Sequence, residues 1–493
     1  MPPSRYSQDI YWEIDTDMTM NTKMISRRKL LKGIGIGAAA LSAHALIETS
    51  SASAQQPAPT VTPLPPVSQS AGSTKVTFWF GLAGNLGNQV RQVVNRYNQS
   101  QTKYFVVPVF QASYDDTINK INTALAGGEL PNVAQVFDIG TQRMIDTKKI
   151  IPVQQLVDRD KIQKDIDDLE PAVRSYFTSA GVLQSMPFNN STAMTYVNRT
   201  ALKQAGLDPQ KKIFTYNELY DAAKKMTKKD ASGKVVRAGV AINNGSWFME
   251  EQIALHEQYI IEPENGRKAR GTKWAFNNET GIKWLEFLKK LLTDGLGVYY
   301  TNSNDAAAAF VKGEAAVHFD SIASLRGITS SVAGTSTPFD VGVAYMPRRD
   351  GAKVGRTIIG GASLWVTNTG SKAQQDGAWD FIKFAIKPET QAFWSSTTGY
   401  YPVRRAAYNL PEMKDALKKY PQFQVAIDQI RSAPANLSNA GGLSGTYVPT
   451  RQEIQKGMDL FWTGKVASAK EALDAAATKM NDQLDEYNST VKA

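Results

Sequence analysis

The segment 75–110, KVTFWFGLAGNLGNQVRQVVNRYNQSQTKYFVVPVF, decides the fold class of this chain. Its two ends, 75–80 and 104–110, are runs of apolar, β-prone residues, which predict strands. Between them GNLG at 84–87 predicts a turn, and the apolar residues after it recur with the spacing of one helix face: Val90, Val93, Val94 and Tyr97. The segment therefore predicts a strand–helix–strand unit with a right-handed crossover.

The next segment repeats this pattern. Ile118, Ile121 and Leu125 give an inward face to a helix predicted over 115–126, and NVAQVFD at 132–138 predicts a further strand. Apolar strands that alternate with amphipathic helices are typical of a parallel sheet covered on both faces. The chain has 493 residues, and a single core seldom grows beyond about 250, so we expect an α/β protein with more than one domain.

Three later stretches indicate a second lobe. FNNSTAMTYVN at 188–198 predicts a polar loop that runs into a strand, and a new set of helices follows it. TIIGGASLWV at 357–366 is apolar and β-prone, yet it contains Gly360 and Gly361, each of which weakens a strand by roughly 0.5–1 kcal/mol. The segment 471–487 predicts a helical tail. Together these stretches indicate two α/β lobes between which the chain crosses more than once.

Composition argues against several kinds of site. The chain has no cysteine and three histidines, so thiolate metal centres, disulfides and the usual metal or catalytic constellations are not expected. Its net charge of +10 is spread through mixed-sign clusters such as 224–234, whereas a nucleic-acid binder gathers its charge on one face. A secreted enzyme with two carboxylates is the alternative, but the serine-hydrolase, zinc-protease and phosphate-loop motifs are absent from the sequence. We therefore predict no catalytic residue, no metal and no cofactor.

The first 54 residues are typical of an export signal. SRRKLLK at 26–32 carries the arginine pair of a twin-arginine signal, and a run rich in Gly and Ala follows over 33–46. ASA at 52–54 offers the small residues that a signal peptidase requires. The run over 33–46 is shorter than the about 20 residues that cross a bilayer, so no membrane anchor is predicted.

The segments on either side of this signal have little pattern. Residues 1–23 are an upstream extension, with Met24 as an alternative start. Residues 55–74, QQPAPTVTPLPPVSQSAGST, are rich in Pro, Ser and Thr and nearly uncharged, which predicts a disordered linker. We therefore expect an exported periplasmic protein whose folded body begins near Lys75.

Several motifs of the folded body occur in a recognisable order. They are KVTFWF…GNLG from 75, PVFQASYDDTINKINTALAGGELPNVAQVFDIGT over 108–141, SMPFNNST…TYVNRTALKQAGLDP over 185–209, IIGGASLWV from 358, TTGYYPV from 397 and WTGK…EALDAA over 462–476. In this order they resemble the family 1 extracellular solute-binding proteins of bacterial ABC uptake systems, in particular the members that bind glycerol-3-phosphate.

The resemblance implies a two-lobe periplasmic-binding-protein fold of type II, with hinge strands between the lobes. The implied lobes are 75–187 with 363–402 (lobe I) and 188–362 with 403–493 (lobe II). In this fold the strand with Gly360 and Gly361 crosses the hinge, where glycine lets the backbone bend and leaves a main-chain amide unshielded.

The resemblance also implies the function. The chain would be the extracytoplasmic substrate-binding component of an ABC importer, capturing glycerol-3-phosphate or a glycerophosphodiester between the lobes. Its implied partners are this small molecule and a membrane permease with its ATPase; we expect a monomer that binds no nucleic acid. The alternative is the same fold with a neutral sugar or oligosaccharide as its ligand.

The resemblance assigns a set of ligand contacts. They are Tyr114, Asp138, Ser191, Asn244, Trp247, Ser321, Gly361, Tyr400 and Arg451. Arg451 brings a planar fork of N–H donors and Gly361 a bare amide, and we expect both to meet one oxyanion from opposite sides of the cleft. Asp138 stands where the family has glutamate and would accept hydrogen bonds from ligand hydroxyls. Without the resemblance, these residue types are equally typical of core packing, turns and solvated surface charges.

Two positions depart from the family pattern. Asn244 replaces one member of a tryptophan pair, which removes about 1–2 kcal/mol of aromatic stacking and widens the cleft. Trp247 keeps the other member, whose ring can face a C–H surface or a choline-type cation. Phe80 stands where a histidine is common.

Overall fold

The computed structural model describes residues 68–492, so the export signal predicted over 1–54 and most of the linker predicted over 55–74 lie outside the described residues. The described residues belong to one compact unit of the chain, and the lobe boundaries therefore stay a prediction. Every helix within residues 68–492 is too short or too polar to cross a membrane. The same residues contain no group of three or more His, Asp and Glu side chains placed to hold a metal ion.

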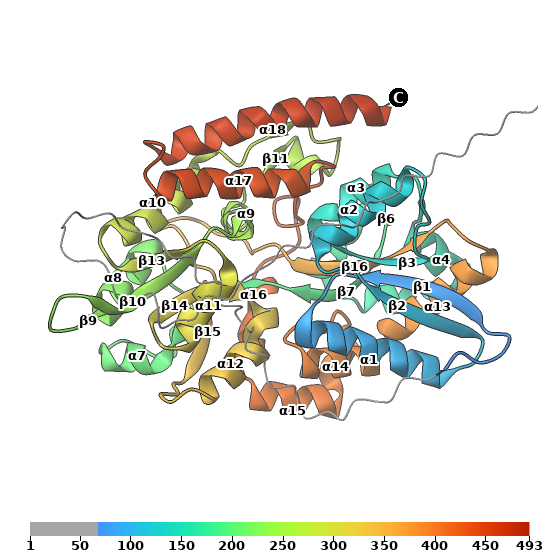
Figure 1. The fold of residues 1–493 in the computed structure, drawn as a ribbon, viewed down its shortest axis with the longest axis horizontal. Coiled ribbons are helices and arrows are strands. Elements are labelled where there is room, and N and C mark those ends of the chain that lie inside the picture. The colour runs from blue at the N-terminus through green and yellow to red at the C-terminus, as the bar shows by residue number, and fades with distance from the viewer. Residues whose placement is uncertain (1–67, 493) are drawn as a thin grey trace, which may run out of the picture. The chain divides into compact units, whose positions relative to one another are not determined.

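The first sheet has the strand order β2-β1-β3-β16-β4, and β7 also pairs with β16 (Figure 1). The strands are β1 (Thr74–Phe80), β2 (Tyr104–Phe110), β3 (Val133–Phe137), β4 (Ile150–Ile151), β7 (Met186–Ser191) and β16 (Gly360–Thr367). β1 is parallel to β2 and β3, which confirms the predicted parallel arrangement. The sheet as a whole is mixed, because β16 runs antiparallel to β3, β4 and β7.

Helices cover this sheet. They are α1 (Gly84–Ser100), α2 (Tyr114–Leu125), α3 (Thr141–Asp146), α4 (Val153–Asp160), α5 (Gln163–Asp167), α6 (Pro171–Phe177), α13 (Lys372–Ala385) and α14 (Pro388–Thr397). The predicted turn at 84–87 is wrong, because these residues form the first turn of α1. Gly87 is required there for packing, since a Cβ would lie 2.3 Å from the carbonyl oxygen of Leu82.

The second sheet has the order β13-β10-β14-β8-β15, and β9 pairs with β10. Its strands are β8 (Ala193–Asn198), β9 (Lys228–Lys229), β10 (Val235–Asn243), β13 (Gly297–Tyr300), β14 (Ala315–Ser321) and β15 (Val341–Ala344). The helices of this part are α7 (Arg199–Gln204), α8 (Tyr216–Met226), α9 (Ser246–Leu255), α10 (Glu279–Thr293), α11 (Ser303–Val311) and α12 (Leu325–Ala333). Two small hairpins pair β5 (Thr178–Ser179) with β6 (Val182–Leu183), and β11 (Ile261–Glu262) with β12 (Lys273–Trp274).

The chain passes between the two sheets at two strand junctions. β7 ends at Ser191 in the first sheet and β8 begins at Ala193 in the second, so the polar loop predicted within 188–198 is largely strand. Its polar residues can be buried because they are bonded, as when Asn190 Nδ2 donates to the carbonyl oxygen of Gly360 at 3.0 Å. The second junction joins β15 to β16.

The double glycine at the start of β16 answers two steric demands. Gly361 has φ of +96°, and a Cβ there would lie 2.0 Å from the carbonyl oxygen of Asn189. A Cβ at Gly360 would lie 2.5 Å from the ring of Trp247. Any other residue would push a strand or a ring away from the junction, so here the packing requires glycine.

The C-terminal part consists of helices. They are α15 (Pro411–Lys419), α16 (Gln422–Ile430), α17 (Tyr447–Trp462) and α18 (Ala469–Lys492), which includes the predicted helical tail. α16 packs on β15 of the second sheet, and α17 packs on α18, α9 and α10. Two large apolar clusters hold the fold together, and each contains residues of both sheets, as in the cluster of Val76 and Tyr196. Burying each large apolar side chain stabilises the fold by about 1.5–3 kcal/mol.

Candidate ligand-binding site

Arg451, in the first turns of α17, is the most strongly bonded of the predicted site residues. Its Nε donates to Oε1 of Glu250 at 2.7 Å, and its Nη2 donates to Oε2 of Glu250 at 2.8 Å. The same Nη2 donates to Oδ2 of Asp138 at 3.1 Å. Asp138 directly follows β3, and Glu250 lies on α9, which follows β10 of the second sheet. The guanidinium therefore joins the two halves of the structure.

Burial sets the electrostatics of this trio. The exposed side-chain fractions are 16% for Arg451, 4% for Asp138 and 1% for Glu250, so water screens their charges weakly. Burial raises the pKa of Asp138 to about 6, although the Arg451 charge opposes that rise. Burial also acts to lower the pKa of Arg451, but the carboxylates of Glu250 and Asp138 together raise it well above its ordinary value. The result is a cation held between two acidic groups.

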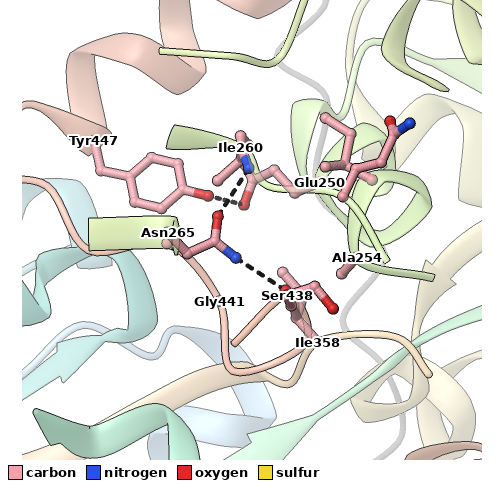
Figure 2. Close-up of a pocket in the computed structure, with 11 residues that line it drawn as sticks. Glu250, Ala254, Ile260, Asn265, Ile358, Ser438, Gly441 and Tyr447 are labelled. Carbon is pink, nitrogen blue, oxygen red and sulfur yellow. Dashed lines mark hydrogen bonds between the residues drawn. The ribbon is translucent and has the colours of Figure 1, made fainter. Parts of the chain in front are cut away.

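Tyr447 lies beside this trio. Its hydroxyl donates to Oε2 of Glu250 at 3.1 Å, and its ring centre is 5.7 Å from the guanidinium carbon of Arg451. Figure 2 shows Tyr447 and Glu250 facing each other at the wall of a cavity of about 10 Å³. That volume suits a single water molecule and is too small for a sugar or a glycerol phosphate.

Tyr114 and Tyr400 form a second group. Tyr114 is the first residue of α2, and its hydroxyl accepts from Nδ2 of Asn189 at 2.8 Å. Tyr400 lies close enough to help raise the pKa of Tyr114. Asn189 is held in turn by Gln135, whose Nε2 donates to its Oδ1 at 2.9 Å. Burial raises the pKa of both tyrosines, so both stay neutral donors and acceptors. Among residues 68–492 the Tyr400 N–H donates to Oγ1 of Thr398, and the Tyr400 hydroxyl proton remains available for a ligand.

The two predicted serines end strands of different sheets. Ser191 ends β7 and is buried; its carbonyl oxygen accepts from the Tyr401 hydroxyl at 3.1 Å, while its own hydroxyl bonds to nothing else in residues 68–492. Ser321 ends β14, and its Oγ accepts from the main-chain N–H of Ala323 at 3.1 Å. Both hydroxyl protons are therefore free to donate to a ligand.

Trp247 and Gly361 meet at the start of β16. Trp247 is half-buried on the first turn of α9, and its ring lies against Gly360, which pairs with Ser191 across the strands. The indole N–H has no partner within the described residues. Gly361 pairs with Asn190, and the convergence of its amide with Arg451 on one oxyanion stays a prediction.

Asn244 is placed differently from the others. Its Nδ2 donates to both carboxylate oxygens of Asp459, at 3.1 and 3.3 Å, and the Tyr299 hydroxyl bonds to the same carboxylate. Asn244 is therefore engaged by α17. The structure bonds Asp138 to Arg451 and places Tyr114 near Tyr400 and Trp247 against the start of β16. It shows no hydrogen bond from Asn244 to another predicted site residue within 68–492.

Glu250 is the participant that the sequence analysis missed. It lies one helical turn after Trp247, on the helix SWFMEEQIAL, and it is buried. The signal that could have found it is this spacing, since residues three apart share a helix face. Its partner Arg451 lies 201 residues later, so no local pattern connects the two.

Comparison with known proteins identifies the family. Residues 92–425 match the model of the bacterial extracellular solute-binding protein family. Among curated relatives, the sn-glycerol-3-phosphate-binding periplasmic protein UgpB of Yersinia enterocolitica is 31% identical over 424 residues, covering 85% of this chain and 94% of the relative. UgpB of Yersinia pseudotuberculosis is 32% identical over the same coverage. The recognised resemblance is confirmed.

Solved structures agree on the fold. UgpB from Mycobacterium tuberculosis, in complex with glycerophosphocholine, superposes with a TM-score of 0.69 at 21% identity. The superposition covers 85% of this chain and 100% of that chain. The sugar-binding protein MalE of Xanthomonas citri gives a TM-score of 0.67 at 20% identity, covering 85% and 99%. The predicted two-lobe type II fold is thereby confirmed, and the chain belongs to the bacterial extracellular solute-binding proteins.

Proposed function

We propose that this solute-binding protein captures glycerol-3-phosphate or a glycerophosphodiester between its lobes and delivers it to the permease of an ABC importer. The observation that carries the proposal is the ion pair of Arg451 and Asp138. In this pair a guanidinium nitrogen from α17 lies 3.1 Å from a carboxylate oxygen at the end of β3. Open α/β sheets bind their ligands at such strand ends. Relatives of 31% identity that are named for binding sn-glycerol-3-phosphate support the same ligand class.

The groups around this pair suit a phosphorylated glycerol. Nη1 of Arg451 makes no hydrogen bond within residues 68–492, and its two hydrogens can donate to phosphate oxygens. The hydroxyls of Ser191, Ser321 and Tyr400 each keep a proton that can be donated to a ligand oxygen. Asp138 can accept from a glycerol hydroxyl, and the Trp247 ring can lie against a C–H surface or a quaternary ammonium.

Binding would act through closure of the lobes. A ligand that contacts Arg451 and Asp138 together interacts with both halves of the structure, so it binds the closed arrangement more tightly than an open one. The closed population then rises by that difference in affinity, and the closed form is the one that the permease would accept.

A neutral sugar or oligosaccharide is the second candidate ligand, and one observation favours it. Two carboxyl groups already balance the charge of Arg451, and carboxylates accept readily from sugar hydroxyls. Solved proteins of the same fold include binders of maltose and mannotriose.

Calorimetry tests these alternatives directly. The purified protein is titrated with glycerol-3-phosphate, glycerophosphocholine and maltose. We expect at least one phosphate ligand to bind with a dissociation constant near micromolar, which is about −8 kcal/mol. Silence of both phosphate ligands together with tight binding of maltose would reject the proposed ligand and favour the second candidate.

We propose further that the protein is exported through the twin-arginine pathway to the periplasm, acts as a monomer beside a permease and its ATPase, and catalyses no reaction. The basis for the export route is the arginine pair Arg27-Arg28 before the apolar run. Replacing both, Arg27→Lys with Arg28→Lys, should retain the precursor in the cytoplasm. Incubation with glycerophosphocholine should release no choline; release would show that the protein is an enzyme.

A further inference from the structure

The bidentate grip of Glu250 on Arg451 changes what this site can accept. Glu250 takes the edge of the guanidinium formed by Nε and Nη2, at 2.7 and 2.8 Å. Asp138 takes the remaining Nη2 hydrogen at 3.1 Å. Only Nη1 is left without a partner among residues 68–492. A phosphate that needs two parallel bonds to one edge of Arg451 must therefore displace a carboxylate.

The trio of Arg451, Asp138 and Glu250 carries a net negative charge of its own. Arg451 supplies one positive charge, and Asp138 and Glu250 supply two negative charges when ionised. Asp115, at the start of α2, is close enough for Arg451 to lower its pKa, although burial raises that pKa overall. Glu251, the next residue on α9, is fully buried, and burial raises its pKa well above the ordinary value.

Two further arginines lie nearby without contacting the trio: Arg267, whose charge acts on the same Tyr176 as the trio does, and the buried Arg356, which lies near Glu251. Tyr447 donates to Glu250, and burial keeps it neutral by raising its pKa. Arg267, in the segment after β11, donates to the main-chain oxygens of Gly441, Tyr176 and others and forms no ion pair within residues 68–492. The guanidinium of Arg451 is thus neutralised by its direct contacts with Glu250 and Asp138 before any ligand arrives.

We propose that Glu250 selects the charge of the ligand: it keeps Arg451 neutralised so that the site accepts a phosphodiester with no net charge, such as a glycerophosphate ester of choline, in preference to a dianionic phosphate monoester. This inference rests on the proposed function, since it concerns which phosphate ligand the same site takes. A zwitterionic diester meets no net repulsion from the acidic pair, and its cationic group can lie on Trp247. A monoester brings about two negative charges at neutral pH toward the same carboxylates.

The test compares glycerol-3-phosphate with glycerophosphocholine by calorimetry at pH 8. We expect the wild-type protein to bind the monoester at least tenfold more weakly than the diester. The measured ratio is the dissociation constant of the monoester divided by that of the diester. Glu250→Gln removes the charge with little change of shape, and it should lower this ratio at least tenfold, mainly through tighter binding of the monoester.

Two variants separate charge from packing. Glu250→Asp keeps the charge and should keep the wild-type selectivity. Glu279→Gln removes a carboxylate that also pairs with an arginine, Arg349, but lies on the surface with 61% of its side chain exposed, and it should leave the ratio unchanged. A ratio that does not change in folded Glu250→Gln would overturn the assignment.

A second measurement needs no variant and covers the case in which Glu250→Gln fails to fold. Between pH 8 and pH 5.5 the monoester gains a proton, whereas glycerophosphocholine does not titrate and so reports the changes of the protein itself. The wild-type ratio should fall at least threefold at pH 5.5; a constant or rising ratio would overturn the inference. If neither phosphate ligand binds the wild-type protein, the proposed function fails along with it, whereas binding of both with an unaltered ratio rejects only the role of Glu250.

Discussion

Two arginines of this protein lie in similar settings and are held in opposite ways. Arg451 is bound by the carboxylates of Glu250 and Asp138. Arg267 is bound by main-chain carbonyl oxygens, with its Nε donating to Gly441 at 2.7 Å and its Nη1 to Tyr176 at 3.0 Å. Each guanidinium also lies over a tyrosine ring, at 5.7 Å from Tyr447 for Arg451 and 5.1 Å from Tyr176 for Arg267.

The difference in partners predicts different tasks for the two arginines. Burial lowers the pKa of Arg267 to about 10, because neutral carbonyl groups do not compensate for the lost water, whereas the acidic partners raise the pKa of Arg451. Each nitrogen of Arg267 is bonded, so this side chain ties the segments around 175–178 and 440–441 together. Arg451 keeps Nη1 without a partner among residues 68–492, beside carboxylates that a ligand could displace. The first arrangement is typical of a structural arginine and the second of a binding residue.

Loss of Arg267 should lower stability strongly without lowering affinity. Arg267→Ala leaves several buried carbonyl oxygens without a donor, so we expect the free energy of unfolding to fall by about 3–4 kcal/mol. Urea unfolding followed by circular dichroism measures this. The folded fraction should bind ligand with unchanged affinity; a loss of affinity without a loss of stability would show that the two arginines do not differ as described.

Arg451→Ala should act on binding as well as on stability, because the two buried carboxylates lose their cation. Removing the guanidinium takes away the free Nη1 donor and leaves Asp138 and Glu250 facing each other, so we expect phosphate-ligand affinity to fall at least 100-fold, about 2.7 kcal/mol. Calorimetry with glycerophosphocholine measures the change. Arg451→Lys serves as the matched control, because it keeps the charge but loses the planar fork, and it should restore part of the affinity. Unchanged affinity in Arg451→Ala would remove this residue from the site.

The acidic partners of Arg451 should also make the stability of the fold depend on pH. The main-chain carbonyl groups that hold Arg267 do not titrate, so we expect no such dependence from that site. Asp138 has a pKa of about 6 in the folded protein, raised by burial above its ordinary value of 3.8. A carboxyl group with a raised folded pKa stabilises the fold when protonated, and this contribution is lost as pH rises from about 4 through 6. Asp138→Asn cannot titrate, so it should gain about 2 kcal/mol over wild type between pH 4 and pH 7. Urea unfolding at several pH values measures that gain, and a difference between the two proteins that is independent of pH would contradict the raised pKa.

The comparison also shows what the sequence could predict. Periodicity located β1, α1 and β2, because apolar spacing follows directly from which face is buried. The motif order identified Asp138 and Arg451, and the structure brings them into contact. The strands and helix were found because they depend on local pattern, whereas the role of Asp138 and Arg451 as ligand contacts stays a prediction.

The failures have a common physical cause. Glu250 was missed because a glutamate on a helix is usually solvated, and only its contact with a residue 201 positions away shows otherwise. The polar segment at 188–191 was predicted as a loop because asparagines disfavour strands, yet Asn189 and Asn190 are buried and bonded in β7. GNLG was predicted as a turn because glycine usually marks one, but Gly87 is there for packing. In each case a long-range contact outweighs the local preference.

The smallest expected effect distinguishes the two tyrosines beneath the arginines. The Tyr447 hydroxyl donates to Oε2 of Glu250 at 3.1 Å, whereas the Tyr176 hydroxyl forms no hydrogen bond with the rest of residues 68–492. Tyr447→Phe leaves a buried carboxylate with one donor fewer, so we expect it to lower the free energy of unfolding by about 1 kcal/mol. Tyr176→Phe keeps its ring over Arg267 and should change stability little, which makes it the matched control. Equal losses of unfolding free energy in the two variants would show that Tyr447 contributes through its ring alone. Glu250 would then be held by Arg451 without help from the Tyr447 hydroxyl.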